Sequence, residues 1–136
     1  MSLTIPGLRV IEVPHGEQRY NTIGDWVPPI RKGAPAQIRV SSMEDKRYVE
    51  LVALHETVEY ELCRIFRRSD QKAVAFDVNY RGPAEEPGDD RRAPYHPEHV
   101  IATFFEKAWA KVRRVDWNTY SDTVRRTTST WKSAQR

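Results

Sequence analysis

The sequence predicts one α+β domain, in which a small N-terminal antiparallel sheet packs on a long helix and on a second, C-terminal helix. Three observations lead to this prediction. Short stretches of alternating apolar residues fall within the first 41 residues, apolar residues then recur at helical spacing, and 136 residues suffice for one core but not for two.

The predicted strands cover residues 7–13, 20–27 and 37–41, where apolar and polar side chains alternate. Pro28 and Pro29 interrupt this pattern, because proline lacks a backbone N–H for a strand ladder. The segments between the strands are therefore expected to be loops.

A long helix is predicted from about Met43 to Phe66 or Arg68, and Ser42 followed by Asp45 resembles a capping box at its start. At about 100° per residue, His55 and Glu59 fall inside the apolar stripe of this helix, one turn apart. The apolar members of the stripe are Tyr48, Leu51, Val52, Val58, Leu62, Ile65 and Phe66.

Residues 73–80 suit either a short helix or a short strand, and their periodicity leaves both open. Residues 81–94 contain Gly-Pro and Pro-Gly pairs and are expected to form an irregular loop beside a site. Pro97 fits the first turn of the second long helix. The residues expected on its buried side are Val100, Ile101, Phe104, Phe105, Ala108, Trp109 and Val112. Residues 115–124 are expected to form a last short helix that closes the core.

The charge distribution argues against a broad nucleic-acid surface. The chain has 22 basic and 19 acidic residues, but residues 125–136 contain four basic residues and no acidic one. Residues 1–124, the predicted domain, are therefore almost neutral, and 125–136 are expected to form a flexible basic tail that binds nucleic acid only weakly, if at all.

One cysteine, Cys63, excludes a disulfide within the chain and fits a reducing compartment. The sequence contains neither an apolar run of about 20 residues nor a recognisable secretion signal. We therefore expect a soluble cytoplasmic protein without a membrane partner. The sequence leaves the oligomeric state open.

The motif His55-Glu56-Thr57-Val58-Glu59 carries the strongest chemical signal, because a buried carboxylate such as Glu59 needs a partner, a proton or a metal ion. On a helix, His-Glu-x-x-His is the zincin signature, in which the two histidines bind zinc and the glutamate activates water. Here Glu59 replaces the second histidine and keeps the i, i+4 spacing. Residues 37–66 thus resemble a zincin core, in which a short edge strand leads into the motif helix.

The resemblance implies a zinc-dependent hydrolase that acts on a peptide or protein, with His55 and Glu59 as metal ligands and Glu56 as the general base. His99 is the preferred third ligand, with Asp77 and His96 as fallbacks. Glu106 is expected to support His99 from outside the metal shell.

The alternative interpretation is a buried His–Glu pair without metal, in a non-catalytic accessory protein that acts through protein–protein contacts. The combination of Gly24-Asp25-Trp26, Leu54-His55-Glu56 and Ala93-Pro94-Tyr95 followed by His99 resembles a group of small uncharacterised proteins of bacteria and phages. This second resemblance implies a compact phage-related protein and no particular activity.

Overall fold

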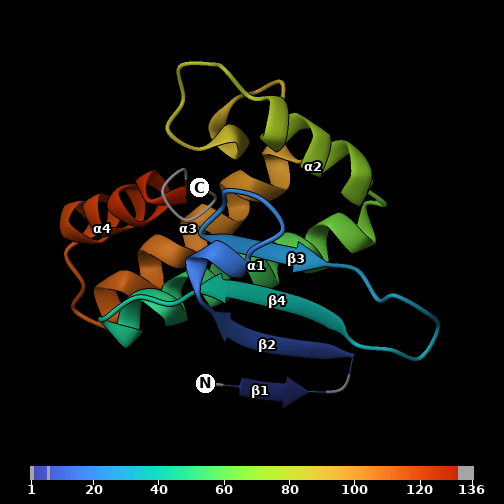
Figure 1. Ribbon diagram of the computed structural model, residues 1–136, viewed down its shortest axis with the longest axis horizontal. Coiled ribbons are helices and arrows are strands. Elements are labelled where there is room, and N and C mark those ends of the chain that lie inside the picture. The colour runs from blue at the N-terminus through green and yellow to red at the C-terminus, as the bar shows by residue number, and fades with distance from the viewer. Residues whose placement is uncertain (1, 6, 132–136) are drawn as a thin grey trace.

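The computed structural model describes residues 2–5 and 7–131 and has an α+β fold. Its sheet contains β1 (Ser2–Ile5), β2 (Leu8–Val13), β3 (Gly24–Val27) and β4 (Ala36–Ser41), in the order β1-β2-β4-β3 (Figure 1). β1 was not predicted, and β3 is shorter than the predicted strand.

The sheet is mixed, so the predicted purely antiparallel arrangement is wrong. β2 and β4 run parallel, with Val10 opposite Ile38, whereas β3 is antiparallel to β4. The cause is the path of the chain: after β2 it crosses to the outer position of β3 and returns as β4 between the two. The strand predicted to be the edge, residues 37–41, is therefore central, and β3 forms the edge.

Helix α1 (Lys46–Ile65) lies between the sheet and helix α3 (His96–Val112). The α1 helix begins at Asp45, whose carboxylate accepts a 3.0 Å hydrogen bond from the backbone N–H of Arg47. Asp45 is the N-cap and Ser42 is not, since the Ser42 hydroxyl donates to Glu12. The predicted capping box is thus wrong, although the predicted start of the helix is close.

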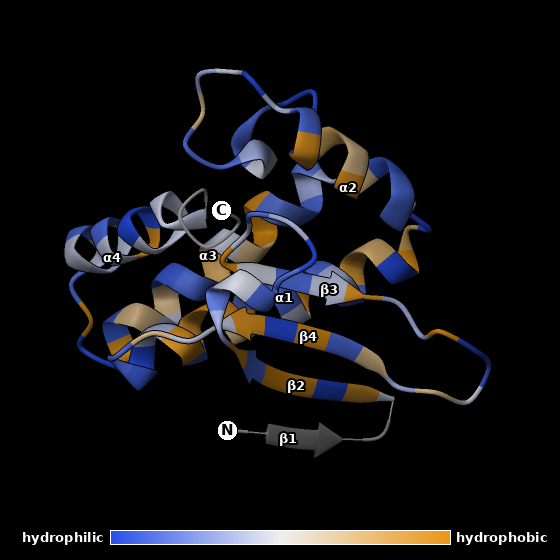
Figure 2. Cartoon of the chain, viewed as in Figure 1, coloured by the Kyte–Doolittle hydropathy of each residue, from blue (hydrophilic) through white to orange (hydrophobic). Residues whose placement is uncertain are grey.

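The core lies between the sheet and α1, where hydrophobic residues of β2 and β4 alternate with hydrophilic ones (Figure 2). Ile38 and Val40 of β4 and Leu51 of α1 are fully buried. α2 (Asp70–Asn79) occupies the segment whose type was left open, and the 3₁₀ turn η2 (Pro87–Asp89) lies in the predicted irregular loop. A further 3₁₀ turn, η1, covers His15–Glu17.

Helix α3 packs with the face opposite to the predicted one. Phe104 and Val112 are 69% and 64% exposed, whereas His99 is 4% exposed and Ala102 is fully buried. All the large side chains predicted to be buried on this helix are exposed: Val100, Ile101, Phe104, Phe105, Trp109 and Val112. The polar side of α3 faces α1 because His99 and Glu106 bond to the motif residues there.

The predicted helix at residues 115–124 is present as α4 (Trp117–Ser129), but it is longer than expected. Arg125 and Arg126 belong to this helix, so the predicted start of a flexible tail at residue 125 is wrong. Residues 132–136 of the predicted tail lie outside the described residues. Among the described helices, none is long and apolar enough to cross a membrane.

Candidate metal centre

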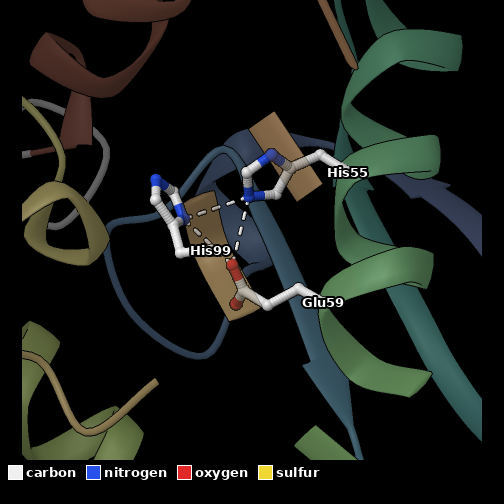
Figure 3. A group of neighbouring side chains, drawn as sticks. All are labelled: His55, Glu59 and His99. Carbon is white, nitrogen blue, oxygen red and sulfur yellow. Dashed lines mark hydrogen bonds and ion pairs between the residues drawn. The ribbon is translucent and has the colours of Figure 1, made fainter. Parts of the chain in front are cut away.

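Three side chains from two helices meet at the centre of the molecule. α1 supplies His55 and Glu59, one turn apart, and the first turns of α3 supply His99 (Figure 3). His55 Nε2 lies 3.1 Å from both Glu59 Oε2 and His99 Nδ1, and the last two atoms are 2.9 Å apart. The exposed fraction of each of the three residues is 6% or less. The predicted ligand set is therefore brought together.

The outward-facing nitrogen of each imidazole is held by a carboxylate. His55 Nδ1 lies 2.8 Å from Glu106 Oε1, and the Tyr120 hydroxyl donates to Glu106 Oε2 at 2.5 Å. His99 Nε2 lies 3.0 Å from Asp89 Oδ1. Carboxylates accept hydrogen bonds, so they favour protons on these two outer nitrogens and fix the orientation of both rings.

Glu59 is held in the same way by a residue of the sheet. Its second oxygen, Oε1, accepts a 2.8 Å hydrogen bond from the indole N–H of Trp26 on β3. This contact leaves Oε2 for the two histidines. All three central side chains are therefore oriented by neighbours that do not themselves enter the centre.

The inner atoms form a cluster that needs positive charge. With the outer nitrogens protonated, a neutral His55 and a neutral His99 present bare lone pairs to each other and to Glu59 Oε2. Three acceptor atoms at 2.9–3.1 Å repel one another unless protons or a cation lie between them.

The pKa shifts of the three groups also favour positive charge at the centre of the cluster. Burial acts to lower the pKa of His99, but the carboxylates of Asp89 and Glu59 outweigh burial and raise it to about 12. Burial also opposes the net rise in the pKa of His55, which is carried well above its usual value by Glu106 and Glu59. The pKa of Glu59 moves against burial to about 2, because both histidines donate to it. All three shifts favour positive charge on the histidines and negative charge on Glu59.

A divalent cation fits this centre chemically and geometrically. Its positive charge would lie among three acceptor atoms 2.9–3.1 Å apart and would offset the repulsion between their lone pairs. Ligand atoms about 2.0–2.1 Å from a tetrahedral zinc ion are about 3.3 Å from one another, close to the spacing observed here. Two imidazoles and one carboxylate are a ligand set that zinc accepts in catalytic sites.

Glu56, the predicted general base, is buried beside this cluster and differs from its neighbours in lacking a partner. It is 8% exposed, and among the described residues none donates a hydrogen bond to its carboxylate. Burial and the charge of Glu59 raise its pKa well above the usual value. An unpaired carboxylate of raised pKa, facing a pocket, is suited to accept a proton.

Two glycines allow the backbone to approach the site closely. A Cβ atom on Gly24 of β3 would lie 2.6 Å from Glu56 Cγ, and one on Gly88 of η2 would lie 2.5 Å from His99 Nδ1. Real Cβ atoms do not approach other atoms so closely, so any larger residue would displace these side chains. Gly24 and Gly88 therefore help to set the positions of Glu56 and His99.

A pocket of about 260 Å³ opens onto the cluster. Glu56 and all three central residues line it, together with β3, α2 and α4. The other carboxylates buried in its wall have partners: Asp25 pairs with Arg19 at 2.7 Å, and Glu106 is bonded to His55 and Tyr120. Glu56 is thus the buried carboxylate of this wall that is left available for chemistry.

The fallback ligands lie outside the cluster. Asp77 accepts hydrogen bonds from the Tyr20 and Tyr95 hydroxyls, and burial raises its pKa to about 6. His96 bonds to the carbonyl oxygen of Gly88. Glu106 does lie outside the inner group, as predicted, but it contacts His55; the prediction that it supports His99 is wrong because His99 turns its Nε2 toward η2.

Sequence reasoning missed three residues that orient the centre. Trp26, Asp89 and Tyr120 lie in the predicted strand, loop and last helix, and the sequence predicts no role at the site for any of them. A buried indole or phenol does need a hydrogen-bond partner, which is the one signal the sequence offered. Nothing local in the sequence indicates that η2 folds back onto His99. Glu86, in the same loop, also approaches His99 Nε2, at 3.3 Å.

Comparison of the chain with protein-family models, with curated proteins and with solved structures gives no match.

Proposed function

We propose that the protein is a zinc-dependent hydrolase that cleaves peptide bonds. The observation that carries this proposal is the convergence of His55 Nε2, Glu59 Oε2 and His99 Nδ1 within 3.1 Å of one another. A purely structural His–Glu pair does not require a second histidine whose inner nitrogen faces the first. Each imidazole also has a carboxylate at its outer nitrogen, and histidines that bind metal usually have such a partner.

In this proposal His55, Glu59 and His99 hold the metal, and Glu56 acts as the base. Bound zinc would supply a water molecule whose pKa is lowered to about 7. The Glu56 carboxylate takes the proton of the attacking water and delivers it to the leaving amine. Trp26 keeps Glu59 in place through its second oxygen, while Glu106 and Asp89 keep the imidazoles oriented.

A peptide substrate is supported by the position of β3. This strand forms one edge of the described sheet, and its residues 24–26 line the pocket beside Glu56. An edge strand offers backbone N–H and C=O groups to an extended chain, which can pair with it as an added strand. The scissile bond of such a peptide would then lie over the cluster.

The substitution Glu56→Gln tests the catalytic part of the proposal. The amide keeps the shape of the side chain but cannot accept a proton at neutral pH, so zinc content should stay at one equivalent while cleavage of a fluorogenic peptide library falls at least 100-fold. Glu61→Gln, on the exposed side of the same helix, serves as the control and should keep full activity. A wild-type protein that holds well under one equivalent of zinc after incubation and desalting refutes the proposal.

A second candidate is the non-catalytic accessory protein, in which the cluster is a protonated structural network. It is supported by the carboxylates around both histidines, which raise the pKa of each ring, and by the exposed apolar face of α3. In that case zinc leaves the melting temperature unchanged, and Glu56→Gln stabilises the fold because it removes a buried unpaired carboxylate. Thermal melts with and without zinc separate the two candidates.

A further inference from the structure

The outer face of α3 carries a regular apolar stripe that the described part of the chain leaves largely exposed. Its members follow the i, i+3, i+4 spacing of one helix face: Ile101, Phe104, Phe105, Ala108, Trp109 and Val112, hereafter the α3 stripe. The large side chains of the stripe are between 39% and 69% exposed. A stripe of this kind normally lies against another helix.

The size of the stripe matches the apolar part of a protein–protein interface. Since each aromatic side chain buries about 150–250 Å² when covered, the exposed fractions of the stripe correspond to on the order of 500 Å² of apolar surface. A stable interface covers about 800 Å² on each partner, and homodimer interfaces are about 65% apolar. The stripe alone would therefore supply the apolar area of one side of such an interface.

The stripe is also complementary to itself in the antiparallel direction. About a twofold axis at its midpoint, Ile101 of one copy faces Val112 of the other, Phe104 faces Trp109, and Phe105 faces Ala108. The pairing of Phe105 with Ala108 places a large side chain against a small one, as close helix packing requires. A twofold dimer needs this type of surface, because each pair of contacts then occurs twice.

A charged neighbour of the stripe is already paired: the Glu50 carboxylate accepts a 3.2 Å hydrogen bond from the Trp109 indole N–H and forms a 2.7 Å ion pair with Arg113. The stripe contains no ionisable side chain, and Lys107, which lies between its members in the sequence, extends over the ring of Trp117 at 5.3 Å. His99 and Glu106 point away from the stripe into the molecule, so the pocket stays open when the stripe is covered.

We propose that two copies of this chain form a twofold dimer in which the α3 stripes pack antiparallel. The occupant is a second copy because one surface supplies the area, the spacing and the size alternation for both sides of the contact. The dimer does not depend on zinc, since no metal ligand belongs to the stripe. This inference is therefore independent of the proposed function.

Light scattering on a size-exclusion column tests the dimer. The wild-type chain is measured at about 50 μM, which is well above the dissociation constants of typical stable interfaces. At this concentration it should have twice the mass of one chain. Phe104→Glu and Val112→Glu should each give the mass of one chain, because a glutamate would be buried without a partner. Ile30→Glu is the matched control: Ile30 is 82% exposed, lies in the β3–β4 loop and should keep the dimer mass. A monomeric wild-type chain, or dimeric Phe104→Glu and Val112→Glu variants, overturns the proposal.

Disulfide cross-linking tests the direction of packing. When Ile101→Cys and Val112→Cys chains are mixed and oxidised, covalent dimers should form between the two variants, while either variant alone should give few. Cys63 does not interfere, because it is buried and burial raises the pKa of its thiol. Efficient cross-linking of each variant with itself means parallel packing and overturns the antiparallel arrangement. Circular dichroism of each variant verifies that it has folded.

Discussion

The two faces of α3 can be compared directly, because they belong to one helix and differ in the residues that the rest of the chain places against them. The inner face carries His99 and Glu106, which bond to His55 and Glu59 on α1, to the Tyr120 hydroxyl on α4 and to Asp89 on η2. The outer face carries the α3 stripe, most of whose large side chains stay at least 42% exposed, and the contact it makes with α1 is the hydrogen bond from Trp109 to Glu50. A set of polar groups that satisfy one another can thus determine which face of a helix points inward, even when the opposite face is more hydrophobic.

The comparison also shows what the inner face costs. Burying two histidines and several carboxylates is unfavourable unless each is paired, and their attraction then only offsets their loss of hydration. The stabilisation of this part of the molecule is therefore expected to depend on the ion or protons at its centre. The outer face, by contrast, should affect association and leave the folding of a single chain almost unchanged.

Among the predicted changes, removal of a proposed ligand on the inner side should have the largest effect on zinc binding and on stability. His55→Ala should abolish zinc binding, which at 100 times the dissociation constant removes about 2.7 kcal/mol of stabilisation. His96→Ala is the control, because the side-chain hydrogen bond of His96 goes to the Gly88 carbonyl oxygen and His96 is not part of the cluster. Zinc analysis and thermal melts measure both variants. Zinc binding that survives in His55→Ala contradicts the assigned centre.

The pH dependence should distinguish protons from metal at the same centre. The pKa of His99 in the folded chain is raised from 6.5 to about 12, so its stabilising contribution is complete below pH 6.5 and is lost as the pH rises toward 12. The pKa of Glu59 is lowered from 4.5 to about 2, so its contribution is complete above pH 4.5 and is lost toward pH 2. In zinc-free protein, the stabilisation from this cluster should thus be greatest between pH 4.5 and 6.5.

Zinc should show the opposite trend with pH, since it displaces the protons. Its apparent affinity should rise by up to about tenfold per pH unit for each proton released. Calorimetric titrations with zinc at about pH 6 to 8, where histidine normally titrates, measure its affinity. Repeating them in buffers of different ionisation enthalpy gives the number of protons released. Affinity that is independent of pH would show that the histidines are already neutral.

Loss of an outer carboxylate should have a smaller effect than loss of a ligand. Glu106→Gln keeps the shape and one acceptor oxygen but removes the charge beside His55 Nδ1, and should weaken zinc binding about 10- to 100-fold. Glu50→Gln provides the control, because Glu50 pairs with Arg113 on the exposed side of the same two helices. Equal zinc affinities in the two variants would mean that Glu106 does not orient His55.

The smallest effects concern the packing of α3 itself. Ala102 is fully buried on the inner face, so Ala102→Leu should overpack the contact with α1 and cost about 1–3 kcal/mol. Ala108 is exposed on the outer face, so Ala108→Leu should change the stability of dilute, monomeric protein by less than about 0.5 kcal/mol. Urea unfolding at low protein concentration compares the two. If Ala108→Leu were more destabilising than Ala102→Leu, the helix would be rotated in solution so that Ala108 faces α1.

The sequence was informative where the signal is local. The strands around Val10 and Ile38, the α1 helix and the approach of His55 to Glu59 all follow from periodicity within a few residues. The same rule failed on α3, because periodicity identifies an apolar face but not whether a partner lies in the same chain or in another one. The mixed sheet was missed for a related reason: the parallel pairing of β2 with β4 depends on the position that β3 takes between them.

The Tyr120–Glu106–His55 chain of hydrogen bonds joins the least hydrophobic helix, α4, to the centre of the molecule. Tyr120 is the buried residue of α4, so the docking of this helix and the state of His55 are thermodynamically linked. A cation bound at His55 would lower the population of open α4 and so slow the exchange of its backbone amide hydrogens, and detachment of α4 would weaken cation binding by the same free energy. The amide exchange rates of α4 would therefore indicate whether a cation is bound at the centre, although α4 supplies none of the proposed ligands.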